Sequence, residues 1–262
     1  MSDAVSVVKI GGSTLGQHDT SLADIAALHQ AGHRCVLVHG GGATISEWLE
    51  KHGVESRFVR GLRVTDGPTL EIVVAVLAGL VNKQLVAELQ ALGARAVGLS
   101  GADGGLLRAR RYDAELGFVG EVTEVAADAL RAVTERAAIA VVAPIAIEAE
   151  GEALRPQLLN INADTAAGEV AAALAAERLV FLTDVAGVMD ASGVVLAELD
   201  SVQAEELLRA GTISGGMTPK VRAGLRAASA SVRTSIVDGR EAGALTSLFE
   251  GTTSASAGTS IR

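Results

Sequence analysis

Two glycine-rich turns that follow predicted β-strands carry residues suited to binding an anion. Lys9 precedes Gly11 and Gly12, and further along the chain His39 precedes the triplet Gly40–Gly42. Glycine allows a sharp turn whose backbone N–H groups face a ligand, and the start of a helix favours negative charge. Neither turn has the spacing of a Walker A loop or a dinucleotide-binding loop. The two turns therefore predict an anion site of another kind.

Lys9 and His39 also have purely structural interpretations. Lys9 could be a solvated side chain beside a tight turn, and His39 could be a histidine packed at the end of a strand. Three consecutive glycines cost conformational entropy on folding, which favours close approach of a ligand as their explanation. Because α/β proteins bind ligands at the carboxyl edge of their parallel sheet, we expect both turns to share one site.

Two further segments place polar side chains where a substrate could be held. Arg63 lies in a loop before a long predicted helix, where its guanidinium could bind a carboxylate or could pair with Asp66. Asn160, Asn162 and Asp164 alternate along an extended segment before another predicted helix. We expect one of the last two to cap that helix, but capping does not account for all three side chains.

The segment Ser214–Lys220 opens a further predicted helix, with Thr218 as its N-cap and Pro219 at its first position. Lys220 then lies in the first turn, where the helix dipole disfavours a cation, so either an anion binds there or the lysine is simply exposed. Asp184 follows another strand in a turn of small residues. With no motif for a nucleophilic hydrolase, this equipment is typical of phosphoryl transfer, which depends on positioning and electrostatic stabilisation.

The elements that would position these residues alternate between strands and helices. Short runs rich in Val, Ile and Leu predict strands at Ala4–Ile10, Arg34–His39, Ala94–Leu99, Ile139–Ala143, Arg178–Thr183 and Ser231–Val237. Ala- and Leu-rich segments predict helices at Ser21–Ala31, Thr44–His52, Pro68–Leu92, Ala126–Arg136, Asp164–Ala176, Ser201–Ala210 and Pro219–Ala230. Strands that are apolar on both sides and alternate with helices predict an α/β fold whose parallel sheet is covered on both faces.

Two predicted hairpins interrupt this alternation. The first pairs Leu106–Tyr112 with Gly117–Val122, and the second pairs Pro144–Glu148 with Ala153–Leu159 around a turn at Glu150. We expect both to add antiparallel strands at an edge of the sheet, where they could cover a substrate. A boundary between two halves of the chain is expected after Asn160.

Composition excludes several classes of protein. The 262 residues are 49% hydrophobic and 20% charged, and the formal net charge is −9. Without a basic stripe, a nucleic acid is not expected as a partner, and a single cysteine, Cys35, excludes an internal disulfide or a Cys-based zinc site. Apolar runs such as Ile72–Val81 are well short of the roughly 20 residues of a membrane span, and the N-terminus lacks the basic region of a signal peptide. We expect a cytoplasmic protein without a membrane partner.

Five segments together resemble the amino acid kinase family, in the same order and over nearly the whole chain. They are Lys9–Gly12, His39–Gly42, Gly61–Thr65, Asn160–Asp164 and Gly215–Lys220. The resemblance implies an open three-layer αβα sandwich with a mainly parallel central sheet and small β-hairpins on the substrate side. It also implies an N-terminal lobe, residues 1–160, that binds an amino acid substrate. A C-terminal lobe, residues 161–262, would bind ATP, and one continuous sheet would run through both lobes.

Within the family, the chain is most similar to members that phosphorylate the side-chain carboxylate of N-acetyl-L-glutamate, the second step of arginine biosynthesis. The resemblance implies that Lys9 and Lys220 stabilise the phosphoryl group in transit and that Asp164 orients both ammonium groups. N–H groups that bind the phosphoryl oxygens would come from Gly11, Gly12 and Gly41. The substrate would be held by Gly41, Gly42, Arg63 and Asn160.

ATP is the cofactor that the resemblance implies. Its binding residues would be Asp184, Val185, Ala186, Gly187, Val188, Met189, Thr212, Ile213 and Ser214. Mg²⁺ is expected between the phosphates of ATP, held mainly by their oxygens and not by a protein metal site. A carboxylate acceptor is already ionised at neutral pH, so the reaction would be a direct in-line transfer without a general base.

Several alternatives remain open at this stage. A similar kinase acts on aminoadipate or glutamate attached to a carrier protein in lysine or arginine biosynthesis, but the intact glycine triplet and the lack of basic residues beyond Arg57 and Arg60 favour the free acetylated amino acid. Other phosphate acceptors, such as carbamate or a nucleoside monophosphate, and a catalytically silent sensor are further possibilities. In this family, arginine-inhibited hexamers carry an extra helix before the first strand. The first strand of this chain is expected to begin at about Ala4, so we expect a homodimer.

Overall fold

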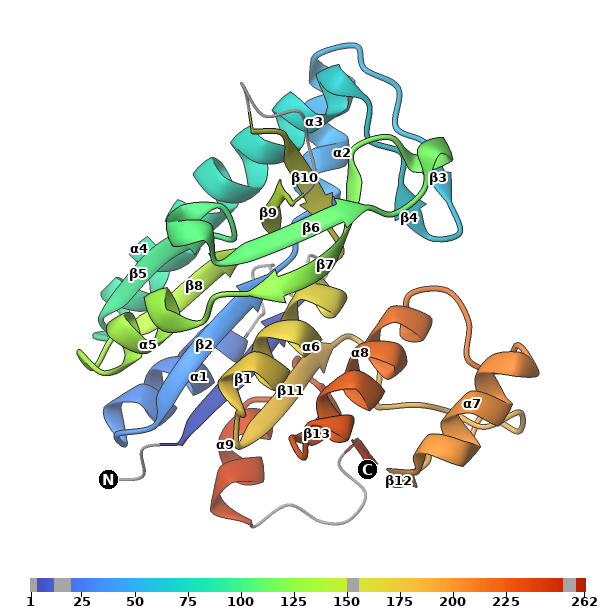
Figure 1. Cartoon of the computed structure of the whole chain (residues 1–262). Coiled ribbons are helices and arrows are strands. Elements are labelled where there is room, and N and C mark those ends of the chain that lie inside the picture. The colour runs from blue at the N-terminus through green and yellow to red at the C-terminus, as the bar shows by residue number, and fades with distance from the viewer. Residues whose placement is uncertain (1–3, 12–19, 150–155, 252–257) are drawn as a thin grey trace.

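Six strands that the sequence predicts lie side by side in an eight-stranded sheet (Figure 1). The structure is a computed structural model that describes residues 4–11, 20–149, 156–251 and 258–262. Each neighbouring pair among the six strands is parallel. In spatial order they are β13 (Arg233–Asp238), β11 (Arg178–Thr183), β1 (Val5–Ile10), β2 (Arg34–His39), β8 (Ile139–Ala143) and β5 (Ala96–Ser100).

Two short strands that the sequence did not predict complete the sheet beyond β13. β14 (Thr259–Ile261) pairs antiparallel with β13, and β12 (Glu198–Leu199) pairs parallel with β14. The sheet is therefore continuous and mainly parallel. The boundary expected after Asn160 falls inside a strand, because β10 runs over Leu158–Ile161.

Helices cover both faces of the sheet and make three layers. One face is covered by α1 (Ser21–Gln30), α2 (Gly42–Lys51), α3 (Gly67–Val74), α4 (Asn82–Ala91) and α9 (Ala244–Glu250). The other face is covered by α5 (Asp128–Thr134), α6 (Ala163–Leu174), α7 (Ser201–Arg209) and α8 (Met217–Ser229). The predicted αβα sandwich is confirmed, although α9 was not foreseen.

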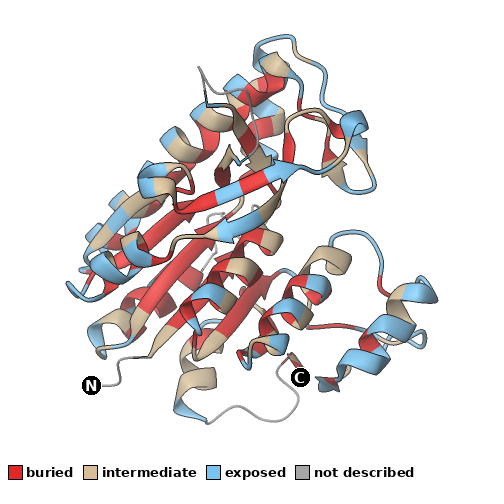
Figure 2. Cartoon of the chain, in the orientation of Figure 1, coloured by how far each residue is buried: buried red, intermediate tan, exposed pale blue. Residues whose placement is uncertain are grey.

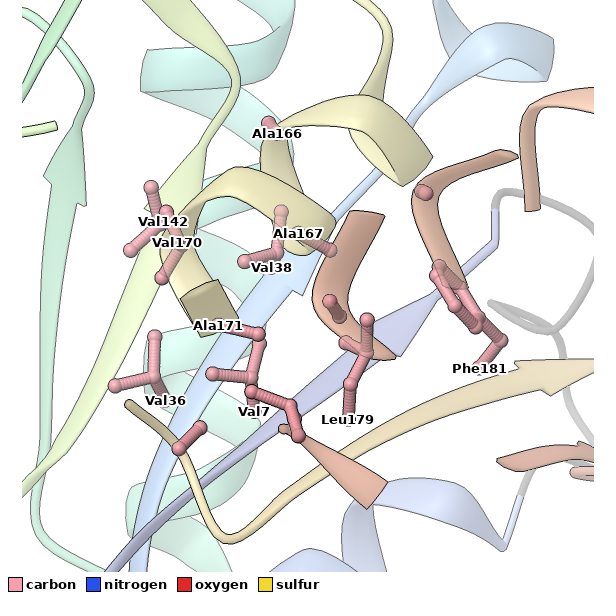
Figure 3. Close-up of a cluster of buried hydrophobic side chains, with 14 of the residues drawn as sticks. Val7, Val36, Val38, Val142, Ala166, Ala167, Val170, Ala171, Leu179 and Phe181 are labelled. Carbon is pink, nitrogen blue, oxygen red and sulfur yellow. The ribbon is translucent and has the colours of Figure 1, made fainter. Parts of the chain in front are cut away.

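Successive residues of the central strands enter different hydrophobic cores. Val7 packs against the α6 face and Val8 against the α1 face, because side chains alternate along a strand. Figure 2 shows that the central strands are buried along most of their length, and Figure 3 shows Val7, Val36 and Leu179 among the side chains below α6. Each fully buried side chain of this size stabilises the fold by roughly 1.5–3 kcal/mol relative to exposure.

The predicted hairpins form a small closed barrel and do not extend the edge of the main sheet. Its strands are β6 (Leu107–Arg111), β7 (Val119–Val125), β9 (Ile145–Glu148) and β10 (Leu158–Ile161). The pairs β6–β7 and β9–β10 are antiparallel, as expected, but parallel pairing of β6 with β9 and of β7 with β10 closes the barrel. Closure satisfies strand edges that would otherwise stay unpaired. The turn expected around Glu150 lies outside the described residues.

Four short elements, two strands and two 3₁₀ turns, connect the larger ones near the barrel. β3 (Phe58–Val59) and β4 (Leu62–Arg63) form a separate antiparallel pair. Two 3₁₀ turns cover Asp103–Gly105 and Ala114–Leu116, and the second lies between β6 and β7.

The predicted helix at Pro68–Leu92 is one continuous helix from Gly67 to Ala91, with a π-helical segment at Ala75–Val81 between α3 and α4. With 25 residues it is long and apolar enough to cross a membrane by length and composition. Core helices meet the same test, and one side of this helix lies in the core below α1. On its outer side, Ala75 and Gly79 are exposed in the middle, whereas Glu71, Lys83 and Glu88 are exposed towards the two ends.

Candidate active site

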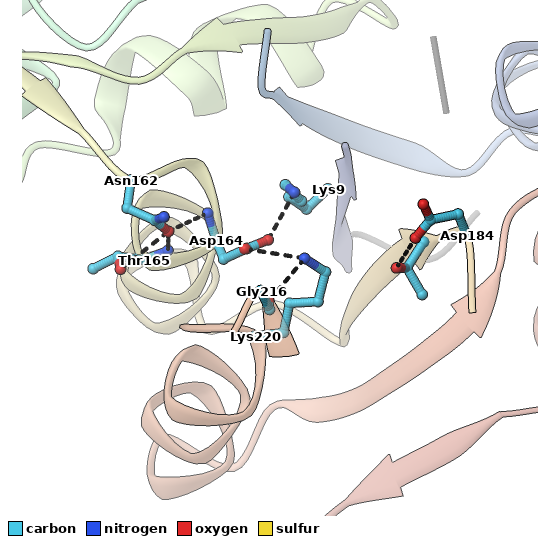
Figure 4. Close-up of polar contacts among 8 residues, drawn as sticks. Lys9, Asn162, Asp164, Thr165, Asp184, Gly216 and Lys220 are labelled. Atoms are coloured by element: carbon cyan, nitrogen blue, oxygen red, sulfur yellow. Dashed lines mark hydrogen bonds and ion pairs between the residues drawn. The ribbon is translucent and has the colours of Figure 1, made fainter. Parts of the chain in front are cut away.

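The ammonium groups of Lys9 and Lys220 meet on one carboxylate, that of Asp164 (Figure 4). Asp164 Oδ1 lies 2.8 Å from Lys9 Nζ, and Asp164 Oδ2 lies 3.2 Å from Lys220 Nζ. The three side chains come from β1, α6 and α8, and Lys220 is the most exposed of them at 13%. We refer to these three residues as the ion triad. Lys9 is therefore not a solvated rim residue.

Asp164 is held in place by the start of α6. Asn162 is the N-cap, and its side-chain oxygen accepts hydrogen bonds from the backbone N–H groups of Asp164 at 3.0 Å and Thr165 at 3.1 Å. The carboxylate lies in the first turn of α6, where the helix dipole stabilises negative charge. Of the two caps that the sequence allowed, Asn162 is the one observed, which leaves Asp164 available to the lysines.

Lys9 is a buried cation with opposing influences. Burial is the largest of these and lowers the pKa of the Lys9 ammonium below its ordinary value, Asp164 raises it, and Lys220 lowers it again. Desolvation disfavours the charged form of a lysine, whereas a nearby carboxylate favours it. An anion bound beside Lys9 would, like Asp164, favour the charged form of this lysine and raise its pKa.

The start of α8 differs from the prediction. Gly216 and not Thr218 is the N-cap, so Pro219 and Lys220 lie two residues further into the helix than expected. The Lys220 ammonium donates to the Gly216 carbonyl at 3.3 Å as well as to Asp164. Lys220 thus bends back along the first turn of α8 towards Asp164.

A cavity of about 220 Å³ opens beside the ion triad. Its wall includes the expected substrate-binding residues, namely Gly41, Gly42, Arg63 and Asn160. Lys9 and Asp164 line it as well, so the charged cluster and the glycine triplet share one space. The expectation that the two turns meet at one edge of the sheet is confirmed for these residues.

The glycine triplet needs its small residues for two different reasons. A Cβ atom at Gly41 would lie 2.7 Å from Leu77 Cδ2, whereas a Cβ atom at Gly42 would meet nothing within 4 Å. Gly41 therefore allows the helix at Leu77 to pack closely, and Gly42 keeps the cavity open. In the described part of the chain, the N–H groups of Gly41 and Gly42 donate no hydrogen bond, which leaves both for a ligand.

Arg63 is fixed by partners that the sequence did not reveal. Its guanidinium donates to Ser46 Oγ at 3.0 Å, to the Gly42 carbonyl at 2.9 Å and to Ser56 Oγ, and it stacks on the ring of Phe58. These bonds use three of its five N–H groups. Burial lowers the pKa of Arg63 from its ordinary value, although a guanidinium stays charged at neutral pH.

The open alternative for Arg63, a pair with Asp66, is not what forms. Asp66 instead caps α3, where its side chain accepts from the Thr69 N–H at 2.9 Å. Asn160 lies on β10 and donates from Nδ2 to Thr65 Oγ1 at 3.1 Å. This bond turns the Asn160 amide towards the β4–α3 loop, which directly follows Arg63. It therefore connects substrate-side residues from distant parts of the chain.

The residues expected around a nucleotide lie apart from this cavity. Asp184 is exposed at the end of β11 and accepts from Thr183 Oγ1 at 3.3 Å, and its charge acts on Lys9 (Figure 4). Val188 and Ile213 are buried in the core below α6, so only their backbones can face a ligand. Exposure varies over the rest of the set, which comprises Val185, Ala186, Gly187, Met189, Thr212 and Ser214. Gly11 follows β1 directly, and Gly12 lies outside the described residues.

A mainly parallel sheet between two helical layers, with a cationic cavity at its carboxyl edge, defines an α/β protein built to bind anionic small molecules. The chain belongs to the amino acid kinase family, whose sequence profile matches residues 4–238. Acetylglutamate kinase of Dehalococcoides mccartyi is 47% identical over 244 residues, which cover 92% of this chain and 89% of that protein. Acetylglutamate kinase of a Ruegeria species is 46% identical over 264 residues, covering 99% and 90%. A crystal structure from Streptococcus mutans superposes with a TM-score of 0.82 at 30% identity, covering 99% of both chains.

Proposed function

We propose that this chain transfers the γ-phosphoryl group of ATP to the side-chain carboxylate of N-acetyl-L-glutamate, as in the second step of arginine biosynthesis. The observation that carries the proposal is the ion triad beside the cavity: two ammonium groups from different elements on a single carboxylate. The full-length similarity to acetylglutamate kinases supports the choice of substrate.

The chemistry of this transfer matches the residues present. A glutamyl carboxylate has a reference pKa of about 4.3, so it is already a nucleophile at neutral pH and needs no general base. The obstacle is its repulsion by the γ-phosphate, roughly 4 kcal/mol per pair of charges about 4 Å apart at an effective dielectric of 20. Lys9 and Lys220 offset this repulsion from two sides of the transferring group, and Asp164 keeps both ammonium groups in position.

The substrate is held by neutral donors and one guanidinium. Arg63 keeps two N–H groups beyond its protein contacts, which suffice to bind the α-carboxylate of N-acetylglutamate. Asn160 and the N–H groups of Gly41 and Gly42 bind the remaining polar atoms and the phosphoryl oxygens, together with Gly11 directly after β1. In this arrangement the amino acid substrate binds to the N-terminal lobe, residues 1–160.

ATP then belongs to the C-terminal lobe, residues 161–262, around Asp184–Met189 and Thr212–Ser214. Among the described residues, no group of three or more His, Cys, Asp or Glu side chains is arranged to hold a metal ion. A bound Mg²⁺ would be held mainly by the phosphate oxygens of ATP, and the exposed carboxylate of Asp184 is the protein group that would contact it from the C-terminal lobe. When bound, the ion would neutralise phosphate charge, while the lysines act on the group in transit.

The proposal is tested by measuring ADP release with purified protein, ATP and Mg²⁺ against a panel of acceptors. N-acetyl-L-glutamate should support turnover with formation of an acyl phosphate that hydroxylamine traps, whereas L-glutamate, L-aspartate, carbamate and UMP should not. Turnover with another member of the panel, and none with N-acetylglutamate, would overturn the proposed substrate. No turnover with any acceptor would instead favour a silent sensor.

A carrier-linked substrate is less well supported. Of the two basic residues near Arg63, Arg60 is paired with Asp113 Oδ2 at 2.5 Å and Glu115 Oε2 at 3.5 Å, so its charge is already neutralised. An acidic carrier protein would find Arg57 as the remaining cation of that segment. The free acetylated amino acid therefore fits the cavity entrance better.

We also propose that the protein is a cytoplasmic homodimer whose interface includes the helix Gly67–Ala91. Ala75 and Gly79 are exposed on its outer side, and Ala78 and Leu80 are half-buried beside them, so the middle of this side is apolar and carries small or aliphatic side chains. Light scattering should give twice the mass of one chain, and Gly79→Arg should shift it to the monomer because nothing within 4 Å occupies the space beside Gly79. A wild-type monomer at micromolar concentration would contradict the dimer.

A further inference from the structure

His39 is a buried residue at the end of β2 that the proposed chemistry does not use. It is fully inaccessible to solvent, and both of its ring nitrogens have partners. Nδ1 lies 2.8 Å from the carbonyl oxygen of Gly40, and Nε2 lies 3.2 Å from Asn82 Nδ2. The packed-histidine interpretation of the sequence is thus confirmed, but its contacts lead directly into the glycine triplet.

The orientation of Asn82 decides which nitrogen of His39 carries the proton. Asn82 Nδ2 donates to the carbonyl oxygens of Val141 at 2.9 Å and Leu99 at 3.2 Å, and Asn82 Oδ1 accepts from Lys83 Nζ at 2.9 Å. A flipped amide would set its oxygen against two carbonyls, so Nδ2 must face His39. Asn82 Nδ2 has two N–H groups for three acceptors, so one N–H is shared, and a proton on His39 Nε2 would point at this donor group. Nε2 therefore carries no proton, and Nδ1–H donates to the Gly40 carbonyl, which can only accept.

Gly98 leaves the space that the Asn82 side chain occupies beside His39. A Cβ atom at Gly98 of β5 would lie 2.0 Å from Asn82 Oδ1, so only glycine leaves space for the amide. Asn82 is the first residue of α4, directly after the π-helical segment Ala75–Val81, and π segments often accompany functional sites. The same helix supplies Leu77, which packs on Gly41. Helix and histidine thus contact the glycine triplet together.

A trans peptide links the Gly40 carbonyl to the Gly41 N–H. The described chain contains no cis peptide, and in a trans peptide the C=O and N–H of one plane point in opposite directions. Holding the Gly40 carbonyl against His39 therefore turns the Gly41 N–H away from the His39 ring, and Gly41 is one of the residues that line the cavity. Three consecutive glycines would otherwise allow this peptide to rotate freely.

We propose that His39, as the Nδ1–H tautomer anchored by Asn82, is a positioning residue that fixes the Gly40–Gly41 peptide so that the Gly41 N–H faces the transferring phosphoryl group. His39 touches neither substrate nor nucleotide and acts through this one peptide. The inference rests on the proposed function for its kinetic readout, whereas the protonation of the ring is measured independently of any activity.

A matched pair of variants tests the role. In His39→Asn, the side-chain amide nitrogen takes the place of Nδ1 and can still donate to Gly40, whereas His39→Gln places its amide at the Nε2 position and loses that donor. We expect kcat with N-acetylglutamate within about 3-fold of wild type for His39→Asn and about 10- to 100-fold lower for His39→Gln, with KM for ATP unchanged in both. A purely structural role would instead lower thermal stability and kcat together in both variants.

The tautomer is read from long-range ¹H–¹⁵N correlation spectra of the wild-type protein at pH 7. The chain has five histidines, so the His39 signals are assigned as those missing from His39→Asn. A protonated Nδ1 with a bare Nε2 supports the inference, and the opposite tautomer or a doubly protonated ring overturns it. Equal kcat in both variants also overturns it. The wild-type protein could fail to phosphorylate N-acetylglutamate and still show the expected tautomer. That result would contradict the proposed substrate but would support the orientation of the Gly40–Gly41 peptide.

Discussion

Replacing Lys9 with methionine separates the catalytic value of a buried cation from its cost to folding. The Lys9 side chain is 6% exposed, and burial is the main reason that its pKa is lowered, so the charged form is disfavoured in the fold. Once Lys9 is gone, Asp164 keeps Lys220 at 3.2 Å, so no buried charge is left alone. Replacing a whole buried ion pair by apolar residues is often neutral or stabilising by about 1–4 kcal/mol, whereas removal of one partner costs about 3–5 kcal/mol when it leaves a buried charge without a counter-charge. Lys9→Met is closer to the first case because Lys220 remains beside Asp164. We expect the free energy of unfolding of Lys9→Met to equal or exceed that of wild type.

Replacing Asp164 with asparagine should have the opposite effect on stability. At an effective dielectric of 20, the attraction of Asp164 amounts to about 6 kcal/mol for Lys9 at 2.8 Å and about 5 kcal/mol for Lys220 at 3.2 Å. The desolvation of the carboxylate cancels a large part of both, and breaking a buried pair costs about 3–5 kcal/mol in measured cases. Asp164→Asn leaves two neighbouring cations without a counter-charge, so it should lose stability of that order.

Both variants should lose activity while their stabilities diverge. Loss of one preorganised donor to a transition state lowers kcat by about 10²–10³-fold, and a full charge is at least as valuable. Urea unfolding with a common m-value gives the stability difference, and coupled ADP release with N-acetylglutamate gives kcat. Wild-type turnover by Lys9→Met would refute its catalytic role. A Lys9→Met protein destabilised as much as Asp164→Asn would refute the electrostatic account of the ion triad.

Three further substitutions probe the walls of the site. Gly41→Ala should lose about 1–3 kcal/mol of stability in urea unfolding because its methyl group meets Leu77, whereas Gly42→Ala should keep its stability and raise KM for N-acetylglutamate by filling the cavity. Arg63→Lys should raise the same KM about 10-fold or more with a smaller change in kcat, because an ammonium cannot bind a carboxylate through a planar pair of N–H groups. Burial lowers the pKa of His39 to about 4 from 6.5, so the unfolded chain binds a proton that the folded chain refuses between these pH values. Neutral His39 therefore adds its full contribution to the free energy of unfolding above pH 6.5, and about 3 kcal/mol of this is lost by pH 4. Urea unfolding measured over this pH range should not show that loss in His39→Asn.

The central strands could be predicted because burial on both faces leaves no ambiguity about their ends. Arg34–His39, Ile139–Ala143 and Arg178–Thr183 match the structure residue for residue. The elements that were missed depend on distant contacts. The N–H groups of Gly243 and Leu245 at the start of α9 donate to Asp24, more than 200 positions earlier, and no local pattern marks that bond.

The barrel and the surroundings of Arg63 show the same limit. Local pairing within each hairpin follows from turn residues and apolar alternation, but the parallel pairing of β6 with β9 joins segments that are not consecutive. Ser46, Ser56 and Phe58 carry no motif, and only the folded chain brings them to one guanidinium. The ion triad could be predicted only in part. Its members lie in segments that the sequence marks, whereas their common contact exists only in the folded chain.

The acidity of the whole molecule explains why the site must attract its ligands locally. With a net charge of −9, the protein as a whole repels both ATP and an acidic amino acid, and at physiological salt this field is screened within about 8 Å. Three helices begin around the ion triad: α2 at Gly42 and α6 at Ala163 line the cavity, and α8 brings the Gly216 carbonyl and Lys220 to Asp164. Each N-terminus carries about half a positive charge close to the ligand. α2 follows β2 of the main sheet, α6 follows β10 of the barrel, and α8 follows α7. Different parts of the fold therefore bring positive potential to the place where two anions must meet.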